Sequence, residues 1–134
     1  MHIDGIIALH KIIKRKAPES DPVTEGATKI GLLQGIVDKP NLTLFGNKPK
    51  YETVLEKAAC LLESIASLHP FIDGNKRTAL LTAYSFLQLE GYDLDLSQVD
   101  PYFLVYVASN NSRTEKEIDM IIAEIVFYFK QRLR

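Results

Sequence analysis

The sequence is poor in several features that define particular protein classes. It has one cysteine, Cys60, and no tryptophan in 134 residues. A single cysteine cannot close an internal disulfide, which excludes a secreted scaffold held together by disulfides. Cys60 falls in an apolar helical stretch, where we expect a buried and inert thiol. An excess of one charge is also missing, because 16 basic and 17 acidic residues leave a formal net charge of −1.

A net charge this close to zero argues against a general nucleic-acid binder, which normally carries a clear positive excess. Any recognition of phosphate must therefore come from a local cluster of basic side chains. The N-terminus lacks a basic region followed by an apolar run, and no apolar stretch approaches the roughly 18 residues needed to span a bilayer. We therefore expect no membrane association, no direct nucleic-acid partner and, by elimination, a cytoplasmic location.

The composition is that of an ordinary globular protein, with 46% hydrophobic and 25% charged residues. The length suits one domain, residues 1–134. Apolar residues recur at helical spacing nearly everywhere, which predicts an all-α bundle of about six helices. Prolines and glycines predict a loop at 17–23 and a possible short extended flap near 41–47, within the loop 39–50. The helices are expected at about 3–16, 25–37, 52–68, 74–91, 98–108 and 115–133.

The most informative segment lies between the third and fourth expected helices and reads HPFIDGNKRT, residues 69–78. Pro70 disfavours a helical conformation in the residue before it, so the third helix should end near His69. The helix that begins around Gly74 leaves its first backbone amides without partners, and such a terminus is a ready anion site. Glycine at this position also lets a ligand approach the backbone closely.

The first turn of this helix carries two cations, Lys76 and Arg77, where they oppose the helix dipole. Cations placed against the helix dipole without a structural reason indicate a functional role. A bound polyphosphate would reverse the problem, because the amides, the ammonium and the guanidinium would then converge on one anion. The same segment read as a plain turn of a helical interaction protein leaves these two basic residues unexplained.

Four further residues of the segment have functional or structural interpretations. Asp73 is either the N-cap of the new helix or a Mg²⁺ ligand, and its position alone does not decide. His69 would be a structural histidine in most settings, but beside a cationic anion site it suits a general base that deprotonates a hydroxyl. Phe71, together with Ile72, is expected to anchor the loop in the core and make it rigid.

This segment resembles the signature of the Fic/Doc (Fido) family. The general Fic pattern is H-x-F-x-D/E-G-N-G-R-x-x-R, but the chain is closer to the death-on-curing branch, whose pattern is H-x-F-x-D/N-A/G-N-K-R-T. The resemblance covers roughly residues 3–95. It includes Leu9-His10 in the leading helix, the Gly26 region, Pro40-Asn41, Phe45-Gly46, and Phe86-Leu87 before Gly91-Tyr92.

The resemblance implies a Fido-type fold, ATP as substrate, Mg²⁺ as cofactor, and a role for each matching residue. His69 would be the general base and Asp73 the metal ligand. Asn75 and the amides after Gly74 would form the anion hole, while Lys76 and Arg77 would bind nucleotide phosphates. A flap at Leu42–Phe45 would dock the target by strand addition.

Two departures from the general Fic pattern bear on the reaction. Lys76 stands in place of a glycine, and Leu80 stands in place of the second arginine. The death-on-curing branch is understood to bind ATP in the opposite sense and to deliver its γ-phosphate to elongation factor Tu, which halts translation. The resemblance therefore implies a kinase-like toxin of a toxin–antitoxin system. Adenylylation by AMP transfer and a catalytically silent binding module remain the alternatives.

Regulation is expected to come from a partner. Many Fic proteins carry an inhibitory helix of pattern S/T-x-x-x-E-G/N, and the nearest match here, Asp21-x-x-x-Glu25-Gly26, lacks the hydroxyl residue. A separate antitoxin that orders on binding would then supply the inhibitory segment. Tyr102, Phe103 and Tyr106 are expected in the core or in contact with this antitoxin. His10 lies on an apolar stripe and is expected to be a hydrogen-bonded core or interface histidine.

Overall fold

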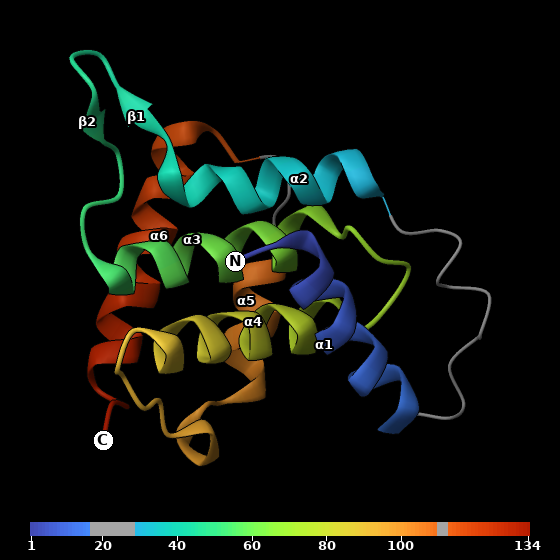
Figure 1. Ribbon diagram of the computed structural model, residues 1–134. Helices are drawn as coiled ribbons and strands as arrows, with labels where there is room; N and C mark the ends of the chain where they lie inside the picture. Colours follow the sequence, from blue (N-terminus) through green and yellow to red (C-terminus); the bar gives the residue numbers. More distant parts are fainter. Residues whose placement is uncertain (17–28, 110–112) are drawn as a thin grey trace.

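A computed structural model describes residues 1–16, 29–109 and 113–134, which form a helical bundle with one small hairpin (Figure 1). The prediction of an all-α bundle of about six helices is confirmed. Within these ranges the α-helices are α1 (Ile3–Lys16), α2 (Ile30–Asp38), α3 (Val54–Leu68), α4 (Asn75–Leu89), α5 (Pro101–Ala108) and α6 (Glu115–Lys130).

Helix α3 forms the centre of the bundle. Every residue from Ala58 to Ser67 is buried, and the helix contacts α2, α4, α5 and α6. A helix that is apolar on most faces must be covered on most faces, and this is the arrangement that its sequence predicts. Cys60 is fully buried here, as expected, and burial raises the pKa of its thiol to about 11.

Side-chain caps set where the helices begin. Thr53 caps α3 by accepting a hydrogen bond from the Glu56 amide, and the Thr53 hydroxyl donates to the Glu56 carboxylate. Thr114 accepts from the Glu117 amide in the same way at the start of α6. These are the residue types that best satisfy the free amides of a first helical turn.

The prediction of a continuous helix over 98–108 is wrong. A 3₁₀ turn, η3 (Leu96–Gln98), comes first, and α5 begins only at Pro101. Asp100 caps α5 by accepting from the Tyr102 amide, and proline at the first helical position has no amide to satisfy. The last helix is also shorter than predicted, because Leu133 leaves it to form an isolated antiparallel bridge with Leu94.

The predicted flap exists as a two-stranded antiparallel hairpin, β1 (Thr43–Leu44) and β2 (Lys48–Pro49). It follows the 3₁₀ turn η2 (Lys39–Asn41) and projects from the helical body in Figure 1. Its turn contains Gly46 and Asn47, both at positive φ, which suits the twist of a tight hairpin. Among the described residues β1 pairs with β2 alone, so its other edge is not paired with a strand.

Several predictions fall on residues outside the described ranges: the loop at 17–23, the near match Asp21-x-x-x-Glu25-Gly26 and the first turn of the helix predicted from 25. The helix observed there, α2, runs from Ile30 to Asp38 with Lys29 as its N-cap, so it begins later than predicted. In the part of the chain that the structure describes, no helix combines the length and the apolarity that crossing a bilayer requires.

Candidate active site

The loop between α3 and α4 starts with His69 in an unusual backbone conformation. His69 caps the C-terminus of α3 in the left-handed region, at φ 51° and ψ 64°. Positive φ is uncommon for residues other than glycine and is often found at functional sites. The imidazole is partly exposed and makes no hydrogen bond to any residue that the structure describes. The ring is therefore accessible and is not tied to the surrounding structure.

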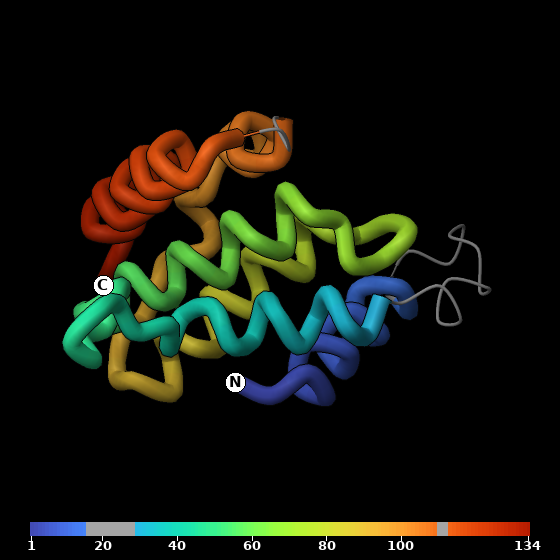
Figure 2. The backbone as a smooth tube through the Cα atoms, turned by 90° about the horizontal axis from the view of Figure 1, so that it is seen from above, coloured from blue at the N-terminus to red at the C-terminus, as the bar shows by residue number. Residues whose placement is uncertain are grey.

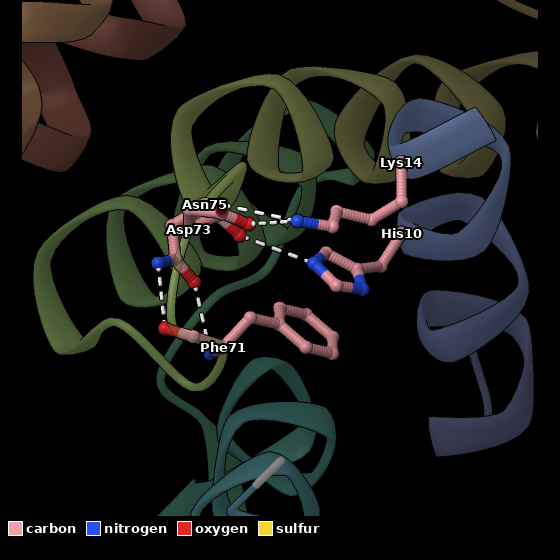
Figure 3. Close-up of polar contacts among 5 residues, drawn as sticks. All are labelled: His10, Lys14, Phe71, Asp73 and Asn75. Carbon is pink, nitrogen blue, oxygen red and sulfur yellow. Dashed lines mark hydrogen bonds and ion pairs between the residues drawn. The ribbon is translucent and has the colours of Figure 1, made fainter. Parts of the chain in front are cut away.

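Asn75 holds the loop closed. Its side-chain oxygen accepts a hydrogen bond from the Phe71 amide at 3.0 Å, and its Nδ2 donates to the Phe71 carbonyl at 2.9 Å (Figure 3). The residue is only 5% exposed. The side chain is thus used to shape the loop, which leaves only the backbone amide of Asn75 for the predicted anion-binding role. No signal in the sequence predicted that the Asn75 side chain would pair with the Phe71 backbone.

Phe71 is buried and anchors the loop, as predicted, but Ile72 does not. Ile72 is 62% exposed, because the turn that follows Phe71 directs the next side chain to solvent. The carbonyl of Pro70 accepts a hydrogen bond from the Lys29 amide at 3.0 Å, which ties the loop to the start of α2. A backbone hydrogen bond and one buried aromatic ring thus fix the loop in addition to the Asn75 side chain.

Helix α4 begins without a side-chain cap. Its N-cap is Gly74, in the left-handed region at φ 71°, so the interpretation of Asp73 as the N-cap is wrong. Thr78 makes the first backbone bond of the helix, to the Gly74 carbonyl at 2.9 Å. The amides of residues 75–77 donate to no group among the described residues. They are free to bind an anion, which the helix dipole also favours.

We expect Gly74→Ala to lower the free energy of unfolding by about 1–2 kcal/mol, because a non-glycine residue is disfavoured at this φ. A Cβ atom at 74 would lie 3.6 Å from His10 and Ile13 side-chain atoms, an ordinary contact, so backbone strain should dominate. Urea unfolding measures the effect. Gly35→Ala, within α2 and with open space around it, is the control and should stabilise the protein. Equal stability of Gly74→Ala and the parent would contradict the assignment of strain.

Helix α1 packs against this loop, at the end of the bundle where α3 turns into α4 (Figure 2). The His10 ring stacks on Phe71 with 3.8 Å between ring centroids, and its Nε2 lies 3.1 Å from the Asp73 carbonyl oxygen. The prediction of a hydrogen-bonded, buried His10 is confirmed. One turn further along, the Lys14 ammonium lies 2.8 Å and 3.1 Å from the two carboxylate oxygens of Asp73 (Figure 3).

A pocket of about 300 Å³ opens where α1 meets the start of α4. Three cationic side chains and one carboxylate share its wall, which is lined by Ile13, Lys14, Asp73, Gly74, Asn75, Lys76 and Arg77. The structure thus brings together the residues predicted from 73 to 77 and adds Lys14, which the sequence analysis missed. His69 belongs to the same loop but is not among the lining residues.

The ligands available around Asp73 suit a metal ion that binds together with a phosphate. Among the described residues, no group of three or more His, Cys, Asp or Glu side chains is placed to hold an ion. The carboxylate of Asp73 is 45% exposed and stands beside a helix terminus that has no side-chain cap. Magnesium in phosphoryl-transfer sites takes one or two carboxylates and completes its shell with phosphate oxygens and water. The residues fit an ion that arrives with a phosphate, and they do not form a preformed cage.

Comparison with known proteins agrees with this geometry. A family model described as the Fic/DOC family matches residues 1–87, which include α1, the hairpin, α3 and the whole site loop. The chain is also 44% identical over 64 residues to Toxin Doc of Mycolicibacterium smegmatis. That match covers 48% of this chain and 48% of the relative, so it spans about half the length of the curated protein. Since the family model covers more than half of the residues and contains the site, the chain belongs to the Fic/DOC family.

Proposed function

We propose that the chain is a Doc-like toxin of a toxin–antitoxin system that transfers the γ-phosphate of ATP to a serine or threonine hydroxyl of a protein. The target class that we propose is a translation factor similar to elongation factor Tu, whose modification would halt translation. The observation that carries the proposal is the cationic pocket at the uncapped start of α4, in the same loop as an accessible histidine. The likeness to a protein named Toxin Doc supports it.

The polar residues of the loop and of the start of α4 divide the tasks of this reaction. The free amides at the start of α4, with Lys76 and Arg77, hold the phosphates of ATP. His69 accepts the proton of the target hydroxyl, and the oxygen of that hydroxyl forms a bond to the γ-phosphorus of ATP. The bond between the γ-phosphorus and the oxygen that bridges it to the β-phosphate breaks at the same time, which releases ADP. Magnesium on Asp73 would neutralise phosphate charge. Asn75 keeps the loop in one shape, so the donors need no rearrangement.

The choice of the γ-phosphate over the α-phosphate is supported by two side chains. Lys76 lines the pocket and fills space that a glycine would leave open. Leu80 is partly buried against the hydrophobic core and offers no charge where an arginine would clamp a second phosphate. Both differences favour the nucleotide orientation that presents its terminal phosphate to the target.

The hairpin is the proposed docking place for the target. Its turn carries Phe45, which is fully exposed, and β1 pairs with only one strand among the described residues. A peptide can add to such an edge through backbone hydrogen bonds alone. An antitoxin partner, which we infer from the name of the related toxin, would supply the inhibitory segment.

The test uses purified elongation factor Tu and, in parallel, bacterial lysate, each incubated with this chain and ATP labelled at either the α- or the γ-phosphate. We expect γ-label on a protein band, and mass spectrometry should find phosphate on a serine or threonine. Incorporation of α-label would establish AMP transfer instead. Absence of both labels, with ATP still bound, would support the silent binding module. A reaction without the chain controls for lysate kinases.

A further inference from the structure

The ion pair between Lys14 and Asp73 lies inside the proposed phosphate pocket. The Lys14 side chain is 15% exposed, whereas that of Asp73 is 45% exposed, and both line the pocket. The ammonium is within hydrogen-bond distance of both carboxylate oxygens. The carboxylate that the proposed function assigns to a metal ion is therefore already engaged by a cation that belongs to the chain.

This ion pair is more fixed than a surface pair between two long, mobile side chains. His10 and Lys14 are one helical turn apart on α1, and both reach Asp73, one at its carbonyl and one at its carboxylate. The stacking of His10 on Phe71 sets the position of α1 against the loop (Figure 3). The packing of α1 against the loop thus places the Lys14 ammonium at the Asp73 carboxylate.

An ammonium and a divalent cation compete for this carboxylate. Magnesium binds carboxylate oxygen at about 2.0–2.1 Å and keeps a complete shell of oxygen ligands. An ion at that distance from Asp73 would stand next to the Lys14 charge, and like charges at such short separation repel. The long and flexible stem of lysine gives its ammonium another place to go, since Lys76 and Arg77 lie across the same pocket and would hold an anion between them.

We infer that Lys14 is a built-in counterion of Asp73 that a divalent cation must displace, and that the displaced ammonium binds the nucleotide phosphate. The inference rests on the proposed function and adds a binding residue to it. Without metal, Lys14 neutralises Asp73 and keeps the pocket attractive for ATP. With metal and ATP, Asp73 is free for the ion, and Lys14 becomes a third phosphate-binding cation beside Lys76 and Arg77.

The inference requires one substitution to shift two affinities in opposite directions. Lys14→Met keeps the apolar stem but removes the charge. It should tighten the binding of Mn²⁺ alone by about tenfold, because the repelling neighbour is gone. It should also weaken the binding of ATP in EDTA by about tenfold, because Asp73 is left unneutralised and one cation is lost. A residue with a merely structural role would weaken both.

The test measures free Mn²⁺ by electron paramagnetic resonance and metal-free ATP binding by calorimetry, on the full chain. Arg15→Met is the matched control, since it removes the same charge from the neighbouring, exposed position of α1 and should leave both affinities unchanged. Lys14→Arg should keep both near the parent values. Adding Asp73→Asn to Lys14→Met should abolish the gain in Mn²⁺ affinity, which locates the ion at this carboxylate.

The results distinguish a failure of this inference from a failure of the proposed function on which it rests. Unchanged or weaker Mn²⁺ binding by Lys14→Met, with ATP still bound by the parent, would overturn the inference alone. A parent chain that binds no ATP with or without Mn²⁺ would overturn the proposed function and the inference with it. Circular dichroism establishes that each variant is folded. If Lys14→Met does not fold, Lys14→Gln takes its place with the same two expected shifts.

Discussion

Replacing His69 with alanine should lower the rate of phosphate transfer by about 10²- to 10⁴-fold, the usual contribution of a positioned general base. The fold should survive, because the imidazole makes no hydrogen bond to any described residue and is only partly covered. ATP affinity should change little, since His69 does not line the pocket proposed to bind phosphate. The measurement is the initial rate of γ-label incorporation into the purified target, with nucleotide affinity determined in parallel.

The backbone at position 69 calls for a second variant. Alanine is disfavoured at a φ of 51°, whereas asparagine tolerates this region better. His69→Asn should therefore be as inactive as His69→Ala while retaining more stability. The matched histidine control is His2→Ala, at an exposed N-terminal position, which should keep the parental rate. Transfer by His69→Asn at more than a tenth of the parental rate would rule out the general-base role.

Asn75→Ala should lower the free energy of unfolding by about 2–4 kcal/mol, because it leaves the Phe71 amide and carbonyl without their partners in a buried setting. Urea unfolding monitored by circular dichroism gives the value. The loss should extend to activity, since an open loop no longer presents His69 and the α4 amides in fixed positions. We expect kcat to fall even under conditions where the variant is fully folded.

Two comparisons make the Asn75 result specific. Asn75→Asp keeps the acceptor for the Phe71 amide but sets an oxygen against the Phe71 carbonyl, so it should also destabilise the protein. Gln88→Ala removes an exposed side-chain amide from the same helix, where its single hydrogen bond goes to Tyr84, and should cost less than about 0.5 kcal/mol. If Asn75→Ala were as stable as Gln88→Ala, the loop would not depend on the two hydrogen bonds between Asn75 and Phe71.

The helices could be predicted because their signals are local. Apolar spacing located α3 and α6, and glycine after the last periodic residue marked the end of α4: Gly91 has a φ of 90°. The signal for α5 was also local, in the pair Asp100-Pro101, but the apolar run around it suggested an earlier start. Single-residue boundaries depend on capping, which periodicity alone does not report.

The missed parts of the site depend on contacts between distant segments. Lys14 and Asp73 are 59 residues apart in sequence, and only the packing of α1 against the loop brings them together. In the sequence, Lys14 is one of three consecutive basic residues at the end of α1, a position that suits cations whatever their function. Asn75 was read through its family motif as an anion ligand, but the geometry of the loop turns its side chain back toward Phe71.

The way in which the loop is held has a further consequence for how this protein can change. Its shape depends on the Asn75 amide, the Phe71 ring and the carbonyls of Pro70 and Asp73. The side chains proposed to meet the nucleotide or the target, at positions 14, 69, 76 and 77, are not among these supports. A substitution at one of them would change the proposed chemistry and leave the supports in place. Such variants should therefore stay folded, so that a change in their reaction reports on the substituted side chain itself.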